Sequence, residues 1–151
     1  MIKTSFVDPV SFDTLVQVSE SLLNERTQKV VAQIVNGIPR FVKPEENYAE
    51  SFGWQWKKWA DNQSEARGSN IKQRELILAR THFSEYPIEG KRILECGMGG
   101  GDDTEVLVGL PFAEIHSFDM STAVERAYEH LKDDRLFISQ ASIYGIPYPF
   151  L

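Results

Sequence analysis

The sequence is poor in cysteine, in basic residues relative to acidic ones, and in long apolar runs. Its single cysteine excludes both an internal disulfide and a cysteine zinc site. A net charge of −6 lacks the basic footprint of a nucleic-acid-binding domain. No apolar run approaches a membrane span, and no basic stretch followed by an apolar one opens the chain. These absences predict a cytoplasmic protein of at most one domain, with neither nucleic acid nor membrane as its partner.

Glycine, by contrast, is concentrated between positions 97 and 101, where four of the five residues are glycine. The apolar run before them, residues 91–96, is typical of a buried strand, and residues 104–110 can form a helix. Strand, glycine loop and helix are the opening unit of a doubly wound α/β nucleotide-binding domain. The dinucleotide fingerprint fails, however, because Asp102 stands in place of its third glycine. Glu95 and the acidic residues after the loop disfavour a phosphate and favour a cation.

The run Ile-Leu-Glu-x-Gly-x-Gly-x-Gly that ends at Gly101 resembles the first motif of Rossmann-like (class I) S-adenosylmethionine-dependent methyltransferases. The resemblance implies S-adenosyl-L-methionine as the cofactor, which has no phosphate and carries a sulfonium and an ammonium group. It also implies that Gly97, Gly99 and Gly101 shape a loop around the methionine part, while Glu95 biases the site toward a cation. A glycine-rich turn with a purely structural role is the alternative.

A second segment agrees with a nucleoside cofactor. Residues 113–119 predict a strand that ends at Asp119, eighteen residues after Gly101. In a doubly wound fold, an acid at this place accepts hydrogen bonds from both ribose hydroxyls. The apolar stripe over residues 124–131 predicts a helix that faces the core. In the methyltransferase family the residue after the acid packs on adenine, a role that the resemblance gives to Met120.

A third strand is predicted over residues 135–141, followed by a turn rich in proline. This segment resembles the third motif of the same family, in which an acidic residue approaches the adenine amino group. Ser142 stands in the place of that acid, and a hydroxyl still accepts one hydrogen bond. The resemblance also implies that the backbone N–H of Ile143 serves an adenine nitrogen.

Residues 1–45 form a separate region rich in β-branched residues. Residues 14–18 and 29–35 predict a β-hairpin, and Asn36-Gly37 predicts a further turn. The segment 34–42 resembles the end of a zinc-ribbon-like module that precedes the methyltransferase domain in some bacterial enzymes. The cysteine pairs of that module are absent here, so the resemblance implies apolar packing in place of a metal. An unrelated β-hairpin extension is the alternative.

Residues 46–90 combine an aromatic segment with a predicted helix over residues 71–82, whose partly apolar face is expected to cover the sheet. All three tryptophans lie between positions 54 and 59, and such side chains bury large areas. The segment resembles the one that precedes the catalytic domain in the same methyltransferases, which implies Tyr48 and Trp54 as a wall of the substrate or cofactor site. The alternative is a hydrophobic clip between the N-terminal unit and the main domain.

The other reactive side chains give no catalytic pattern. His82, His116 and His130 lack metal-ligand spacing and are interpreted as surface or helix residues. Cys96, inside a predicted strand, is interpreted as a small buried hydrophobe. No catalytic residue is assigned, and methyl transfer needs little from side chains beyond in-line positioning.

The sequence therefore predicts a partial Rossmann-like α/β fold, with three parallel strands and flanking helices in residues 91–151 and a small N-terminal β-hairpin extension. The expected function is the cofactor-binding half of an S-adenosylmethionine-dependent methyltransferase for a small-molecule acceptor, inactive as an isolated truncated chain. The alternatives are a domain for another nucleoside or dinucleotide, and a non-enzymatic assembly or regulatory module. Because the first strand of such a half-domain is left at an edge, a homo-oligomer that buries this edge is also predicted.

Overall fold

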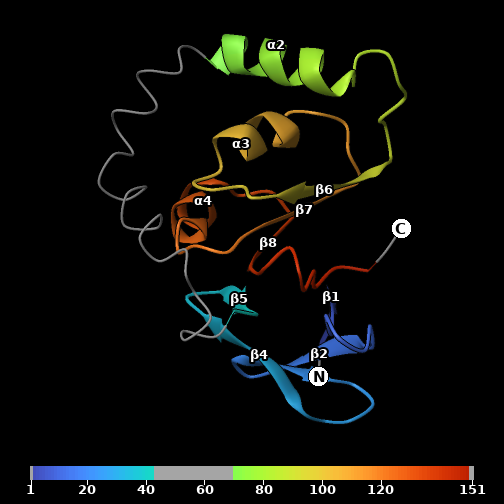
Figure 1. Cartoon of the computed structure of the whole chain (residues 1–151), viewed down its shortest axis with the longest axis vertical. Helices are drawn as coiled ribbons and strands as arrows, with labels where there is room; N and C mark the ends of the chain where they lie inside the picture. The colour runs from blue at the N-terminus through green and yellow to red at the C-terminus, as the bar shows by residue number, and fades with distance from the viewer. Residues whose placement is uncertain (1, 43–69, 150–151) are drawn as a thin grey trace.

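The computed structural model describes residues 2–42 and 70–149 of the chain (Figure 1). The elements in these residues are β1 (Ile2–Val7), β2 (Thr14–Val18), β3 (Ser21–Asn24), β4 (Val30–Val35), β5 (Ile38–Arg40), α2 (Asn70–Thr81), β6 (Arg92–Cys96), α3 (Asp102–Val108), β7 (Glu114–Asp119), α4 (Val124–His130) and β8 (Leu136–Gln140). None of the helices in the described ranges is long and apolar enough to cross a membrane.

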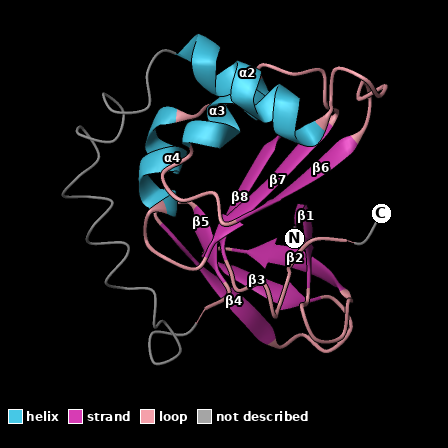
Figure 2. Ribbon diagram, turned by 45° about the horizontal axis from the view of Figure 1, so that its top comes forward, coloured by secondary structure: helices cyan, strands magenta, loops and turns pink. Residues whose placement is uncertain are grey.

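All eight strands belong to one sheet with the spatial order β1-β2-β3-β4-β5-β8-β7-β6. The neighbours from β1 to β5 pair antiparallel. The pairs β5 with β8, β8 with β7 and β7 with β6 are parallel. Figure 2 shows the antiparallel half turned away from the parallel half, so the sheet is curled, like a half-barrel.

Tight turns and one buried amide shape the antiparallel half. Asn36 and Gly37 have φ values of 53° and 80° and join β4 to β5 as a two-residue hairpin turn, which confirms the turn predicted there. Asn24 at the end of β3 is buried, and its amide nitrogen lies 2.9 Å from Oδ2 of both Asp8 and Asp13. Its side-chain oxygen accepts two backbone N–H groups from the turn that follows. One side chain thus links the β1–β2 turn to the β3–β4 turn.

The two halves of the sheet are joined where β5 meets β8. The backbone N–H of Phe41 donates to the carbonyl of Gln140 over 2.8 Å. The guanidinium of Arg40 lies 3.1 Å from the side-chain oxygen of Gln140 and 3.1 Å from a carboxylate oxygen of Glu125 on α4. Arg40 therefore fixes β5 to both a strand and a helix of the C-terminal half.

Three apolar clusters fill the interior. The first lies within the curl of the sheet and draws on both halves: Phe6, Leu15, Leu22, Ala32, Phe118, Ala141 and Tyr148. The second packs α2 and α3 against the parallel strands: Ile77, Val106, Leu107, Leu110, Phe112 and Ile115. The third packs α4 against the sheet: Ile38, Met98, Val124, Ala127 and Ile138. Because Ile38 of β5 lies in the α4 cluster, the N-terminal strands share their core with the rest of the chain.

The predicted fold class is wrong. The described residues form a mostly β structure, an eight-stranded mixed sheet in which antiparallel pairing predominates and few helices accompany the strands, in place of a Rossmann-like α/β fold. The N-terminal residues are also more than a hairpin extension, since they supply five strands of the common sheet. The physical reason is the pairing of β5 with β8, which makes the N-terminal strands a continuation of the C-terminal ones.

The local elements agree better with the sequence. Strands were predicted at residues 91–96, 113–119 and 135–141, and β6, β7 and β8 lie there. Helices α2, α3 and α4 likewise lie within two residues of their predicted positions. Figure 1 shows α2 and α3 stacked on one side of the parallel strands, so the covering role predicted for α2 is confirmed.

Candidate functional site

The carboxyl ends of the three parallel strands β6, β7 and β8 lie side by side. The loops that follow them carry most of the candidate site residues from the sequence analysis. The loop after β6 holds Gly97 to Gly101, the end of β7 holds Asp119 and Met120, and β8 leads into Ser142 and Ile143. The register of β6 with β7 and of β7 with β8 keeps these ends level, since Cys96 pairs with Phe118 and Asp119 with Gln140. Parallel topology alone therefore gathers the predicted cofactor residues at one place.

The glycine loop lies directly against the end of β7. The N–H groups of Gly97 and Met98 both donate to the carbonyl of Phe118, over 2.8 and 3.0 Å. Gly97 has a φ of 83°, and no atom lies within 4 Å of the place where its Cβ would stand. This position is open on the side where a ligand could approach the backbone closely.

Gly101 serves a different purpose. Its φ is 91°, and a Cβ there would stand 2.8 Å from the Cβ of Ala127 and 3.0 Å from a methyl of Leu131. This glycine lets the start of α3 pack against α4. This contact between helices adds to the loop-shaping role that the resemblance implies for Gly101, which stays a prediction.

Asp119 is tied to the loop by its carboxylate. Oδ2 accepts the N–H of Gly99 over 2.9 Å, and Oδ1 accepts both the N–H and the hydroxyl of Ser121, over 2.8 and 2.7 Å. A carboxylate has about four acceptor positions, so three donors leave one, on Oδ2. The group can therefore accept one further hydroxyl without losing a bond that the protein already makes.

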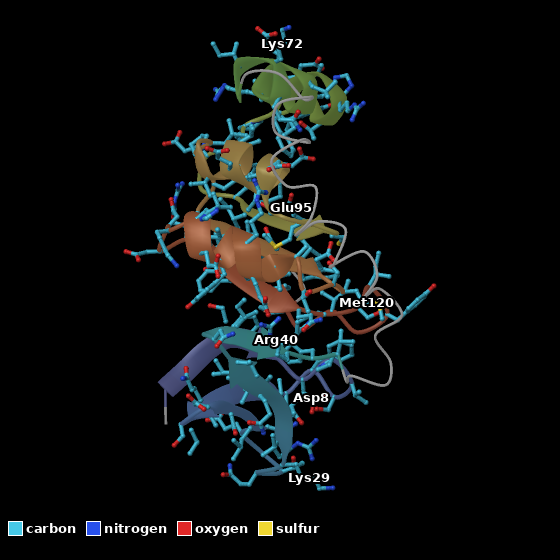
Figure 3. All side chains as sticks on the ribbon, turned by 90° about the vertical axis from the view of Figure 1, so that its left-hand side faces the viewer. Asp8, Lys29, Arg40, Lys72, Glu95 and Met120 are labelled. Carbon is cyan, nitrogen blue, oxygen red and sulfur yellow. The ribbon has the colours of Figure 1, made fainter. Side chains whose placement is uncertain are left out.

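Glu95 belongs to β6 and lies next to α3 (Figure 3). Its Oε2 accepts the hydroxyls of Thr104 and Ser117, over 2.7 and 2.8 Å. Burial raises the pKa of this carboxyl, the two hydroxyls oppose that effect, and the charges of Asp103 and Asp119 add to it. Glu95 thus links the first turn of α3 to β7 through hydrogen bonds and contributes negative potential close to the glycine loop.

Arg126 is a component of the site that the sequence did not indicate. Its Nη1 lies 3.0 Å from Oδ1 of Asp102 and 3.1 Å from the carbonyl of Gly100, which it reaches from α4. A Cβ on Gly100 would meet this guanidinium at 2.7 Å. Nothing in the sequence links positions 26 residues apart in this way, since the contact depends on how α4 packs beside the loop. Arg126 offsets part of the acidic charge at this end of α3.

The residues assigned to adenine lie at the same edge with their side chains partly exposed. Met120 is half-buried, and its carbonyl accepts the side-chain amide of Gln140 over 2.8 Å (Figure 3). Ser142 is half-buried, and its hydroxyl accepts the N–H of Tyr144 over 3.3 Å. Ile143 is 60% exposed. Tyr48 and Trp54, assigned to the substrate wall, lie outside the described residues.

Two interpretations of single residues are wrong. Cys96 is exposed, because β6 is the last strand in the sheet order. His116 is buried within a strand, where its ring stacks on Phe137 at a centroid distance of 5.0 Å. Its Nε2 lies 2.8 Å from a carboxylate oxygen of Glu114, and burial lowers the pKa of the imidazole. Within the described ranges, no group of three or more His, Cys, Asp or Glu side chains is arranged to hold a metal ion.

Comparison with family models and curated sequences identifies no relative from which a role could be inferred. No protein-family model matches the chain, and none of the curated protein sequences matches it significantly. The resemblance to Rossmann-like methyltransferases is therefore wrong as a statement of family: the motif residues are present, but in residues 2–42 and 70–149 the sheet is mixed and mostly antiparallel and the helices are few and short.

Proposed function

We propose that the chain binds S-adenosyl-L-methionine at the edge where β6, β7 and β8 end, and that it supplies the cofactor-binding part of a methyl transfer to a small-molecule acceptor. The observation that carries this proposal is the contact between the glycine loop and Asp119, in which Gly99 N–H and the carboxylate lie 2.9 Å apart. In the same loop, Gly97 has open space at its Cβ position and donates to the carbonyl of Phe118, the residue before Asp119, whose carboxylate keeps one acceptor position. The proposal rests on this geometry and not on membership of a family.

The charge of the site supports a cationic nucleoside over a phosphate. Glu95, Asp103 and Asp119 are close enough for the charges of the last two to raise the pKa of Glu95. A pyrophosphate in the same place would meet this negative potential, whereas a sulfonium and an ammonium group would be attracted to it. The net charge of −6 likewise favours a small-molecule acceptor over a nucleic acid.

In this proposal, five of the candidate residues contact the cofactor. Gly97 offers its open backbone to the methionine part, and Asp119 accepts one ribose hydroxyl on Oδ2. Met120 and Ile143 flank the adenine with partly exposed apolar surface, and Ser142 offers a hydroxyl at its rim. When bound, the cofactor supplies an activated methyl group on a good leaving group, so the chain has only to position it. The cytoplasmic location expected from the sequence stays part of this proposal.

A second candidate is a non-catalytic assembly or regulatory module. One observation favours it: Asp119 already receives three donors from Gly99 and Ser121, so the loop is closed on the carboxylate without any ligand. A glycine loop whose hydrogen bonds are made within the protein agrees with a purely structural role for the loop.

Calorimetric titration separates the two candidates. The whole chain is titrated with S-adenosylhomocysteine, with NAD as the competing dinucleotide and with adenosine as a test of the nucleoside part alone. We expect S-adenosylhomocysteine to bind and NAD not to bind. Binding of neither by a chain that circular dichroism shows to be folded would remove the cofactor proposal and leave the module. Tighter binding of NAD would assign the site to dinucleotides.

A further inference from the structure

Among the described strands, β6 forms an open edge of the sheet. This strand is the last in the sheet order, and within residues 2–42 and 70–149 its one hydrogen-bonded neighbour is β7 (Figure 2). Its pairing with β7 runs in continuous register from Arg92 to Cys96, and no proline or bulge interrupts it. Its charged residues are Arg92 and Glu95, and the carboxylate of Glu95 is already bound by the hydroxyls of Thr104 and Ser117. Edge strands without such interruptions offer their free backbone groups to another strand.

The direction of the free groups follows from the bonds at the two ends of the strand. The N–H of Gly97 donates to β7, to Phe118 O over 2.8 Å, and the carbonyl of Lys91 accepts from Ala113 N–H over 2.7 Å. Because successive residues of a strand direct their N–H and C=O groups to opposite sides, the residues between them alternate. The backbone groups of Arg92, Leu94 and Cys96 therefore point away from β7, at the open edge.

We propose that two copies of the chain pair through β6, antiparallel, with the two-fold axis at Leu94. In this register Leu94 stands opposite Leu94 of the partner subunit, and Arg92 opposite Cys96 of the partner subunit. All three outward-pointing residues of each copy then meet outward-pointing residues of the other, so every free N–H faces a free C=O. A shift of one residue would set the free backbone groups of one copy opposite residues of the other copy whose N–H and C=O groups point toward β7. A shift of two residues would leave some of the free N–H and C=O groups without a partner.

The side chains at the edge suit this arrangement. Leu94 is 40% exposed, and at the axis it would be covered by its own counterpart. Leu76 of α2 is 41% exposed and lines, with Leu94, Ile93, Phe83 and Leu107 among others, a cavity of about 390 Å³. A strand added beside β6 lies at the rim of that cavity, so pairing also shields apolar surface of α2. The glycine loop takes no part, so the pairing is independent of the cofactor proposal.

Cross-linking tests the register directly. A Leu94→Cys change in a Cys96→Ser background would bring two thiols to the axis, where the Cα atoms of a hydrogen-bonded antiparallel pair lie about 5.5 Å apart, within disulfide range. In the unchanged chain the two Cys96 residues would be offset by four residues along the strands and about 14 Å apart. We expect a covalent dimer from the double variant under mild oxidation and none from the unchanged chain. Equal cross-linking of the unchanged chain would overturn the proposed register.

A proline variant tests the backbone pairing. Leu94→Pro removes an N–H that β7 does not use, and proline is tolerated in edge strands. Leu94→Thr keeps the N–H and the strand and serves as the matched control. Light scattering should show a dimer for the unchanged chain and for the control, and a dissociation constant raised at least tenfold for the proline variant. A monomer at all concentrations, or a dimer unaffected by proline, would overturn the proposal; if the proline variant fails to fold, the cross-linking result decides.

Discussion

Gly37, in the turn between β4 and β5, lies directly against Tyr128 on α4. A Cβ at Gly37 would stand 2.3 Å from the Tyr128 hydroxyl oxygen and 2.7 Å from Cζ. The turn therefore does more than reverse the chain, because it brings the N-terminal strands against a helix of the C-terminal half. The glycine is required there both by its φ of 80° and by this contact.

Gly37→Ala is expected to lower the free energy of unfolding by about 1–3 kcal/mol, since the new methyl group must displace Tyr128 and the backbone is strained. Gly90→Ala is the matched control, because Gly90 has a φ of 71° but no atom within 4 Å of its Cβ position. Urea unfolding of both variants separates the cost of backbone strain at a positive φ, which both share, from the cost of the contact with Tyr128, which only Gly37→Ala has. Equal losses in the two variants would show that Tyr128 moves aside freely.

Arg40 makes the polar part of the same connection. Its side chain is 11% exposed and contacts Glu125 and Gln140 (Figure 3). Arg40→Ala leaves the partly buried Glu125 without this cation, and we expect a loss of about 2–3 kcal/mol in the free energy of unfolding. Arg26→Ala is the control, since Arg26 pairs with Asp13 at an exposed position and its loss should change stability little. Similar urea midpoints for the two variants would contradict a special role for Arg40.

Local signals in the sequence identified elements, while contacts between distant residues decided the fold. The apolar run before the glycines was enough to predict β6, and Asn36-Gly37 was enough to predict the turn between β4 and β5. The pairing of Arg40 with Gln140 joins residues a hundred positions apart, and neither residue carries a local sign of it. That one pairing turns a predicted separate extension into part of the common sheet.

The same limit explains the errors at single residues. Residues 14–18 and 29–35 were predicted to form one hairpin, which is wrong: the chain already reverses at Ser19, whose φ is 52°, and β3 pairs between the two strands. Cys96 and His116 were misjudged because burial depends on which strand lies at the edge. In the candidate site, the sequence motifs were enough to predict that the ends of β6, β7 and β8 lie close together. The hydrogen bond from Arg126 to the carbonyl of Gly100 could not be predicted, because it depends on where α4 packs.

Asp119 gives the prediction that bears most directly on the proposed cofactor. Asp119→Ala removes the acceptor of the ribose hydroxyl and of Gly99 N–H, so S-adenosylhomocysteine should bind more weakly by about 1–3 kcal/mol. Asp134→Ala removes an exposed acid at the other end of β8 and should leave the affinity unchanged. Titration calorimetry measures both variants. Unchanged affinity in Asp119→Ala would remove Asp119 from the site.

Glu95 predicts how stability depends on pH. Burial raises the pKa of its carboxyl above the ordinary value, so the folded state favours the protonated form. The contribution of this group to stability is fully present below the unfolded pKa of about 4.3 and is lost as the pH rises through the folded pKa. Glu95→Gln keeps an oxygen that can accept the hydroxyls of Thr104 and Ser117 but cannot ionise. We therefore expect the variant to match the unchanged chain in acid and to become the more stable of the two as the pH rises, measured by urea unfolding across that range.

Glu129→Gln, at an exposed position on α4, controls for the loss of one surface charge. A stability difference that does not vary with pH would show that ionisation of Glu95 costs the fold nothing.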